Sequence, residues 1–425
     1  MIPIVRSILC KDIVRRFLGL FTVNVLGLPL GAITSIVITR YVGPQVYGDY
    51  KFIDSVFRMA IVVCNLGLFN AASRALLLNK DRARAREYYA TTLLITLALS
   101  VVMCAGLFIY ATLDPNIASK GLYHAFLCVL PFGAVYIINY CFEVLLQADN
   151  QIRLLSKVRL LPKIGYLVGG VVALMYLQNV SFSKLLTVCY IYLFTQAIVY
   201  VYVFIKLSPQ FSNQKSRWEE VKRYNREYGI DVYIGALFAT GVATLPDILI
   251  SYFGVDNQGV GFYSLSLMLA SPLAFIPSTV ATIQYREYAY RASISRKSII
   301  ITTLLSVGVL LALWLVVPLF IDCFYSSEFA VVSQYSRVVS IGVLLYGMAD
   351  FVNRFVGAQG RGKLLRNSSF AVGGAVLLFN MMLIPYYGVW GAVWSKLIVG
   401  AIYLSIMIYC YLKTTKELTQ MQQDI

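Results

Sequence analysis

Twelve apolar runs, each long enough to cross a lipid bilayer as a helix, follow one another along the chain and constrain its fold more than any other feature. A bilayer core about 30 Å thick needs roughly 20 apolar residues per helix. Together the runs use nearly all of the 425 residues, so no soluble domain is left over. We therefore predict an all-α integral membrane protein. The runs cover residues 17–39, 52–73, 88–111, 122–146, 158–177, 184–205, 230–252, 262–285, 299–321, 332–353, 368–385 and 389–412.

Lysine and arginine are distributed unevenly between the segments that connect these runs. One set of segments, which includes both tails, holds 29 of the 36 basic residues, and the opposite set holds only Arg40, Lys51, Lys120 and Lys184. Short cytoplasmic loops carry an excess of basic residues. The bias therefore predicts that both chain termini lie on the cytoplasmic side, with the basic N-terminal end retained as a cytoplasmic tail.

A long polar segment in the middle of the chain separates six runs from six. We predict an N-terminal six-helix bundle over residues 1–206, a cytoplasmic central loop over 207–229 and a C-terminal six-helix bundle over 230–425. The halves also resemble each other, because YVGPQVYGDY follows the first run and YFGVDNQGVGFY ends the seventh. An even number of spans per half predicts parallel repeats, related by a pseudo-two-fold axis along the membrane normal. Transport folds commonly place the substrate path between such halves.

The distribution of charge and the cysteine and histidine content exclude several other classes of protein. The net charge of +16 is spread over short patches between apolar runs, which is typical of loops that meet anionic lipid headgroups. A nucleic-acid-binding protein would gather that charge on one face or domain. The eight cysteines are scattered singly without a CxxC pair, and His124 is the one histidine. We therefore expect no nucleic-acid partner, no disulfide framework, no metal site and no catalytic triad.

Three segments resemble a known family. RYVGPQVYGDY at 40–50 is similar to its Gly-Pro-x-x-Tyr-Gly turn after the first helix, and NLGLFNAASR at 65–74 to its Leu-Gly-Leu segment ending in arginine. FNMMLIPYYGVWGAVWSKLI at 379–398 is similar to its hairpin between the last two helices. The family is that of the polysaccharide biosynthesis proteins, the Wzx-type O-antigen flippases. Its superfamily also holds the multidrug and toxin extrusion transporters and the lipid II flippase.

This resemblance implies a substrate, partners and a location. Such flippases move an undecaprenyl-diphosphate-linked oligosaccharide from the inner to the outer leaflet of the bacterial cytoplasmic membrane. The expected partners are this substrate, membrane lipids, a polysaccharide polymerase and a chain-length regulator, and no cofactor is expected. Whether a proton or a sodium ion drives the cycle stays open. The alternative on the same fold is a drug or cation antiporter, and against it the first run offers only Asn24 where drug-extruding relatives often keep an acid.

An enzyme is not expected, because the short outer loops contain no visible catalytic set. A diphosphate and a large sugar cannot cross hydrocarbon unaided, since unpaired charges and hydroxyls are costly there. The protein must therefore supply a wet, partly cationic cavity while the prenyl tail stays in lipid. Charged residues inside the apolar runs are the candidates to line that cavity.

Asp54, Arg58 and Lys396 are the first of these candidates. Asp54 and Arg58 are four residues apart in the second run, so a helix places them on one face. Arg58 either faces the cavity with Asp54 holding it, or forms a local ion pair with that acid. Lys396 is predicted near mid-membrane, too deep for easy snorkelling. It either binds substrate or pairs with an acid such as Asp350 or Glu143.

Asp247, Asp350 and Arg354 complete the set of candidate substrate-binding residues. Asp247 follows Pro246 in the seventh run, and in the resembled fold the first, second, seventh and eighth helices line the cleft. Asp247 therefore either faces Arg58 across the cleft or lies near the outer interface without a role. Asp350 and Arg354 are four residues apart near the cytoplasmic end of the tenth run, where a local ion pair is the other explanation.

Overall fold

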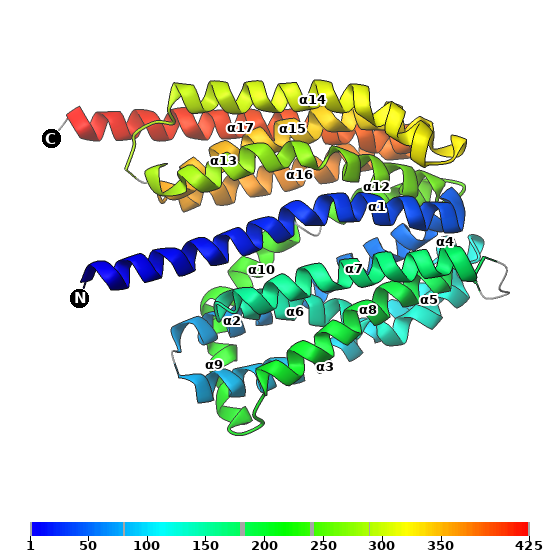
Figure 1. Ribbon diagram of the computed structural model, residues 1–425, viewed down its shortest axis with the longest axis horizontal. Coiled ribbons are helices and arrows are strands. Elements are labelled where there is room, and N and C mark those ends of the chain that lie inside the picture. The colour runs from blue at the N-terminus through cyan, green and yellow to red at the C-terminus, as the bar shows by residue number, and fades with distance from the viewer. Residues whose placement is uncertain (1, 80, 179–182, 239–241, 289, 424–425) are drawn as a thin grey trace. The chain divides into compact units, whose positions relative to one another are not determined.

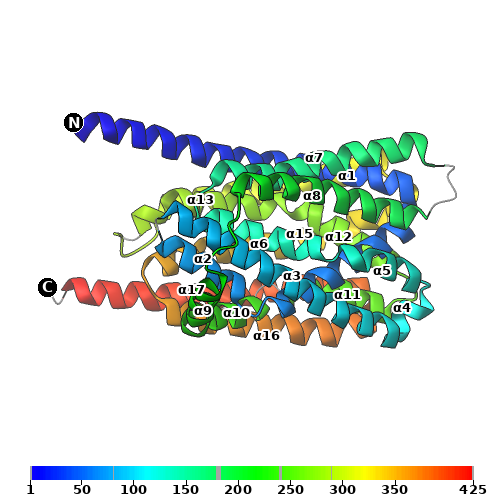
Figure 2. The same cartoon turned by 90° about the horizontal axis from the view of Figure 1, so that it is seen from below.

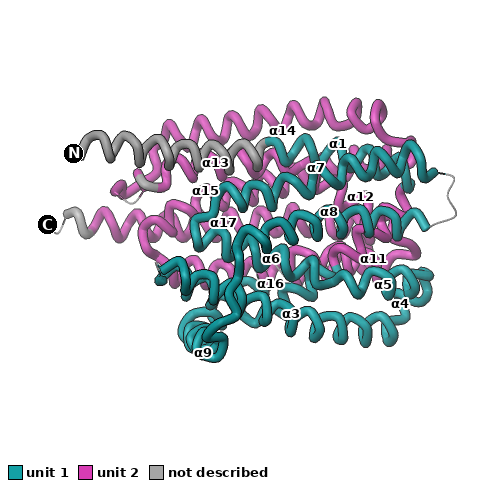
Figure 3. Tube along the Cα trace, turned by 60° about the horizontal axis from the view of Figure 1, so that its bottom comes forward, with its two compact units in different colours: residues 1–43, 56–237 teal, residues 44–55, 238–425 magenta. Residues whose placement is uncertain are grey.

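The computed structural model describes residues 2–79, 81–178, 183–238, 242–288 and 290–423, with the side chains of 2–25, 286 and 421–423 outside that description. Helices make up nearly all of the described chain and strands make up none of it, which confirms the predicted all-α class (Figure 1). The chain divides into two compact units, coloured separately in Figure 3. Unit 1 comprises Met1–Gly43 and Val56–Leu237, and unit 2 comprises Pro44–Ser55 and Phe238–Ile425.

The helices are named in chain order. Those up to the central segment are α1 (Ile2–Cys64), α2 (Leu68–Leu78), α3 (Arg82–Leu113), α4 (Pro115–Ser119), α5 (Tyr123–Val129), α6 (Ala134–Ala148), α7 (Ile152–Tyr176), α8 (Lys184–Leu207) and α9 (Gln214–Tyr224). Those that follow are α10 (Ile230–Ala236), α11 (Leu245–Phe253), α12 (Gln258–Ala270), α13 (Pro272–Tyr288), α14 (Arg296–Phe324), α15 (Val331–Ala358), α16 (Gly362–Tyr387) and α17 (Val389–Gln423).

The first two predicted spans meet at a break within α1 and not at a loop. Gly43 has φ 77° and ψ 176°, which interrupts the helical path between two helical stretches. Glycine reaches this left-handed φ without a steric penalty. Pro44 follows, and proline suits the first position of a helix because its φ is already helical and its missing N–H is not needed there. The Gly-Pro pair therefore ends one helix and begins the next.

Three other predicted spans are broken helices. The second run splits at Gly67 (φ 77°), between α1 and α2. The fourth bends by 43° between Tyr123–Phe132 and Ala134–Ala148. The seventh divides into α10 and α11, and Pro246 stands in the first turn of α11. Nine of the described helices are long and apolar enough to span a membrane, or ten with the bent pair counted as one span, and the number of twelve stays a prediction.

Unit 1 has a core of fully buried phenylalanines. Phe57, Phe69, Phe126 and Phe142 are all less than 2% exposed. Phe57 stacks on Tyr136 with ring centroids 5.0 Å apart, an arrangement that adds to the free energy of burying the two rings. Helices α7 and α8 pack side by side, as Figures 1 and 2 both show.

The central polar segment forms a helix, α9, that packs against α2 and α3 within unit 1. Arg217 carries this contact, because its guanidinium donates to Glu87 of α3 at 2.8 Å and to Glu220 at 2.6 Å. Glu87 also accepts hydrogen bonds from Ser212 and Asn213 at 3.0 and 2.9 Å. The predicted central loop is therefore attached to the N-terminal helices by a partly buried ion-pair network.

Unit 2 is organised around α15. This helix packs against α12, α13 and α17, while α16 packs against α17. Gly342 and Gly400 allow α15 and α17 to approach closely, because a Cβ on either would lie only 2.8 or 2.7 Å from a backbone oxygen of the other helix. Small residues have the same effect at helix contacts within membranes. The close approach fixes which side chains of α15 and α17 lie opposite each other along the two helices.

Candidate functional site

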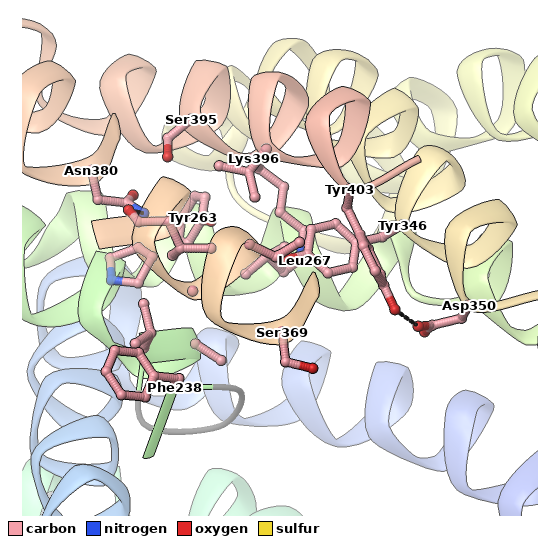
Figure 4. Close-up of a pocket in the computed structure, with 17 residues that line it drawn as sticks. Phe238, Tyr263, Leu267, Tyr346, Asp350, Ser369, Asn380, Ser395, Lys396 and Tyr403 are labelled. Atoms are coloured by element: carbon pink, nitrogen blue, oxygen red, sulfur yellow. Dashed lines mark hydrogen bonds between the residues drawn. The ribbon is translucent and has the colours of Figure 1, made fainter. Parts of the chain in front are cut away.

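A pocket of about 310 Å³ lies within unit 2, enclosed by side chains of α11, α12, α15, α16 and α17. This volume is in the range of small-molecule binding sites. Two of the predicted site residues, Lys396 and Asp350, line it, and Figure 4 shows them with the aromatic side chains that surround them. We call it the C-terminal pocket.

Lys396 projects from α17 onto an aromatic ring of α15. Its ammonium nitrogen is 3.9 Å from the centroid of the Tyr346 ring, a cation–π contact. The close approach at Gly342 and Gly400 places this pair, since Tyr346 is one turn from Gly342 and Lys396 one turn from Gly400. Among the described residues no direct salt bridge joins Lys396 to an acid, but the Asp350 carboxylate acts on the ammonium through its charge. Glu143, the other predicted partner, pairs with Arg159 at 3.1 Å.

Asp350 forms the charged end of the pocket. It accepts a hydrogen bond of 2.8 Å from the Tyr403 hydroxyl, which in turn accepts one of 2.8 Å from the Asn353 amide (Figure 4). The tyrosine comes from α17, which packs against α15. Arg354, one turn further along α15, is exposed and acts on the Asp350 carboxylate through its charge. A substrate role and a local pair of Asp350 with Arg354 both stay predictions.

The remaining predicted residues lie elsewhere. Asp247, in the first turn of α11, accepts hydrogen bonds from Ser55 at 2.6 Å and from Ser264 at 3.4 Å, and it does not line the C-terminal pocket. Asp54 is 7% exposed and belongs to unit 2. Arg58, one turn further along α1, belongs to unit 1, where its guanidinium donates to the Tyr192 hydroxyl at 3.2 Å. The structure thus brings together Lys396 and Asp350 from the predicted set.

Several residues of the pocket were not predicted. Tyr263, Tyr346 and Tyr403 supply its aromatic walls, and Asn380 and Ser395 supply polar groups at the end away from Asp350 (Figure 4). The side chains of Asn380 and Ser395 are 2% and 1% exposed. A polar side chain within an apolar run is a signal that the sequence does contain, whereas the choice among many tyrosines needs the fold.

This arrangement can bind a ligand that is hydroxylated or negatively charged. The ammonium of Lys396 is a donor, the carboxylate of Asp350 and the amide oxygen of Asn380 are acceptors, and the rings present flat apolar faces. A sugar matches this mixture, because its hydroxyls donate and accept while its C–H faces pack on aromatic rings. An organic cation matches the carboxylate of Asp350 and the aromatic rings, whereas the ammonium of Lys396 would repel it.

Comparison with solved structures identifies the fold. The lipid II flippase MurJ in an inward closed conformation has a TM-score of 0.71 with 13% identity over 95% of this chain and 90% of that one. An inward-facing multidrug resistance MATE family transporter of the MOP superfamily has a TM-score of 0.63, with 13% identity over 93% and 95% of the two chains. A MOP superfamily transporter from Pyrococcus furiosus has a TM-score of 0.52, with 13% identity over 95% and 94%.

The chain therefore has the multi-pass membrane fold that this flippase and these transporters share. No curated protein sequence matches the chain. The sequence profile described as "Polysaccharide biosynthesis protein" matches residues 13–283, which is more than half of the chain. This protein belongs to the polysaccharide biosynthesis protein family.

Proposed function

We propose that this protein is a flippase that moves undecaprenyl-diphosphate-linked oligosaccharide repeat units from the inner to the outer leaflet of the bacterial cytoplasmic membrane by alternating access. Family membership and the likeness to the MurJ fold support a lipid-linked substrate. The proposal includes cytoplasmic N- and C-termini and work alongside a polysaccharide polymerase and a chain-length regulator. It assigns no catalytic step to the protein.

The observation that carries this proposal is the position of Lys396 in the wall of the C-terminal pocket. A lysine inside a transmembrane helix is costly, and such residues commonly mark a substrate path. The residue is half-buried, its ammonium is held over Tyr346 at 3.9 Å, and it lines a space that also contains neutral acceptors. An anionic or hydroxylated group entering that space would be attracted to the ammonium and would stabilise it.

The same observation argues against a drug or cation antiporter, the other activity that this fold supports. The positive charge of Lys396 would oppose the binding of a cation in the same pocket. In the C-terminal pocket Asp350 faces one lysine and is already hydrogen-bonded to Tyr403. Asn24, at the place in the first run where drug-extruding relatives often keep an acid, lies outside the described side chains.

Deletion of the gene in its host tests this proposal. We expect loss of surface polysaccharide and accumulation of lipid-linked repeat units on the cytoplasmic side, with unchanged resistance to cationic drugs. Lys396→Met should fail to restore the polysaccharide, whereas Lys396→Arg, which keeps the charge, should restore it in part. Lys413→Met is the matched control, because Lys413 is an exposed lysine of the same helix outside the pocket. Intact polysaccharide together with new drug sensitivity after deletion would favour the antiporter.

A further inference from the structure

Two buried oxygen atoms at one end of the C-terminal pocket have no hydrogen-bond partner. They are the side-chain oxygen Oδ1 of Asn380 on α16 and the hydroxyl oxygen Oγ of Ser395 on α17. Both residues line the pocket, and Figure 4 shows them at the same end, away from Asp350. A buried polar atom without a partner costs free energy, so such atoms need an explanation in each case.

The orientation of the Asn380 amide is fixed by its own helix. Its nitrogen Nδ2 donates to the backbone carbonyl of Val376 at 2.7 Å. Rotating the amide by half a turn would bring Oδ1 against that carbonyl, and two acceptors repel each other. Oδ1 must therefore point away from Val376, and Asn380 offers this oxygen as an acceptor on its remaining side.

The surroundings of these oxygens define what could satisfy them. The ring of Tyr263 lies beside them, and Lys396 and Tyr346 lie between them and Asp350 (Figure 4). A metal ion would need several ligands, and no group of histidine, cysteine or acidic residues able to hold one occurs among the described residues. A ligand with two neighbouring hydrogen-bond donors and a flat apolar face fits the site. Sugar rings have both, as hydroxyl or acetamido donors on a ring with apolar C–H faces.

We propose that Asn380 and Ser395 select the sugar, with the two oxygens accepting hydrogen bonds from two donors of one sugar ring of the substrate. This inference rests on the proposed function. It assigns selection among sugars to the neutral end of the pocket, whereas Lys396 attracts any anionic or hydroxylated group. Both oxygens are enclosed in this conformation, so the pocket widens at this end when the ring enters.

Binding of free sugars to the purified, reconstituted full-length protein tests the assignment. The probes are methyl glucoside, methyl galactoside, N-acetylglucosamine and glucuronate, with affinity measured from saturation-transfer NMR titrations. Asn380→Leu keeps the size of the side chain and removes the acceptor, and Ser395→Ala removes the hydroxyl. Each should weaken binding of the preferred sugar by roughly threefold to tenfold, the effect of one net hydrogen bond. The differences in affinity among the four probes should become smaller as well.

Ser405→Ala is the matched control. Ser405 is an exposed serine of α17 outside the pocket, and its hydroxyl donates to the Ala401 carbonyl at 2.9 Å, so its loss should leave sugar affinity unchanged. Thermal unfolding separates a binding role from a structural one. Asn380→Leu removes the hydrogen bond to the Val376 carbonyl as well as the unpaired buried acceptor, and these two effects on stability should nearly cancel while the variant binds sugar more weakly. A destabilised Asn380→Leu with unchanged sugar affinity would assign these oxygens to the packing and overturn the inference.

The result also distinguishes this inference from the flippase proposal. If the reconstituted protein flips lipid-linked oligosaccharide but both variants keep the affinity and sugar preference of the parent, the inference fails and the flippase proposal stands. In that case ordered water is the occupant of this end. If the protein binds sugars as described and moves no lipid-linked substrate, the subsite stands and the flippase proposal fails.

Discussion

Arg217→Met in the contact between α9 and α3 is predicted to release α9 from unit 1. The Arg217 side chain is 10% exposed, and so is that of Glu87, its partner at 2.8 Å. Removing the guanidinium leaves Glu87 with hydrogen bonds from Ser212 and Asn213 but without a positive charge. Removing one partner of a buried ion pair costs about 3–5 kcal/mol. The Glu220 carboxylate loses its 2.6 Å contact as well.

Hydrogen exchange of the α9 backbone measures this effect, because the lost free energy lowers the cost of opening that helix. An effect of about 3–5 kcal/mol corresponds to exchange faster by roughly 100-fold or more. Arg361→Met is the control, since its pair with Glu417 at 2.8 Å is more exposed, with side chains 29% and 36% accessible. Such pairs contribute about 0–1 kcal/mol.

The double variant Arg217→Met with Glu87→Gln separates the charge from the packing. It removes the isolated carboxylate and should recover most of the protection that the single variant loses. Equal exchange in the parent and in Arg217→Met would contradict the assignment of α9 docking to this ion pair. Equal exchange in the single and double variants would show that packing of Arg217, and not the uncompensated charge, produces the effect.

Two further substitutions test the packing that positions the pocket. Gly342→Val should separate α15 from α17, because a Cβ there would lie 2.8 Å from the Lys396 carbonyl oxygen. We expect a lower melting temperature and weaker sugar binding. Gly308→Val is the control and should leave the melting temperature and sugar binding unchanged, because the space at its Cβ position is open. Tyr403→Phe removes the donor to Asp350 and the acceptor for Asn353, which should cost about 1 kcal/mol in unfolding experiments, and an unchanged stability would contradict that role.

The sequence predicted the helical class well, because each apolar run carries its own signal. Residues 299–321, for example, fall within α14, and 368–385 within α16. It predicted the breaks less well. The second run reads as continuous, yet it divides at Gly67, and the seventh contains two helices, one ending at Ala236 and the other beginning at Leu245. Hydrophobicity changes little across such a break, so only the backbone conformation reveals where the helix stops.

The candidate site was predicted in part. Lys396 stood out because a charge deep in an apolar run has a high cost, and the structure places it in the pocket. The aromatic partner of Lys396 was not predictable from the sequence, because the chain contains 31 tyrosines and the packing of α15 on α17 selects Tyr346. Asn380 appeared only as part of a family motif. Whether its oxygen has a partner depends on the arrangement of α16 and α17, which no spacing in the sequence reveals.

Transport of a lipid-linked oligosaccharide by the purified protein in proteoliposomes measures flippase activity itself. The substrate is a radiolabelled undecaprenyl-diphosphate-linked oligosaccharide from the host, and accessibility to an added glycosidase reports movement between leaflets. We expect rapid movement of the lipid-linked oligosaccharide between leaflets with the parent protein and with Lys413→Met. Movement should be slow with Lys396→Met and partly recovered with Lys396→Arg. Unchanged movement with Lys396→Met, or none with the parent protein, would contradict a flippase that binds its sugar at this lysine.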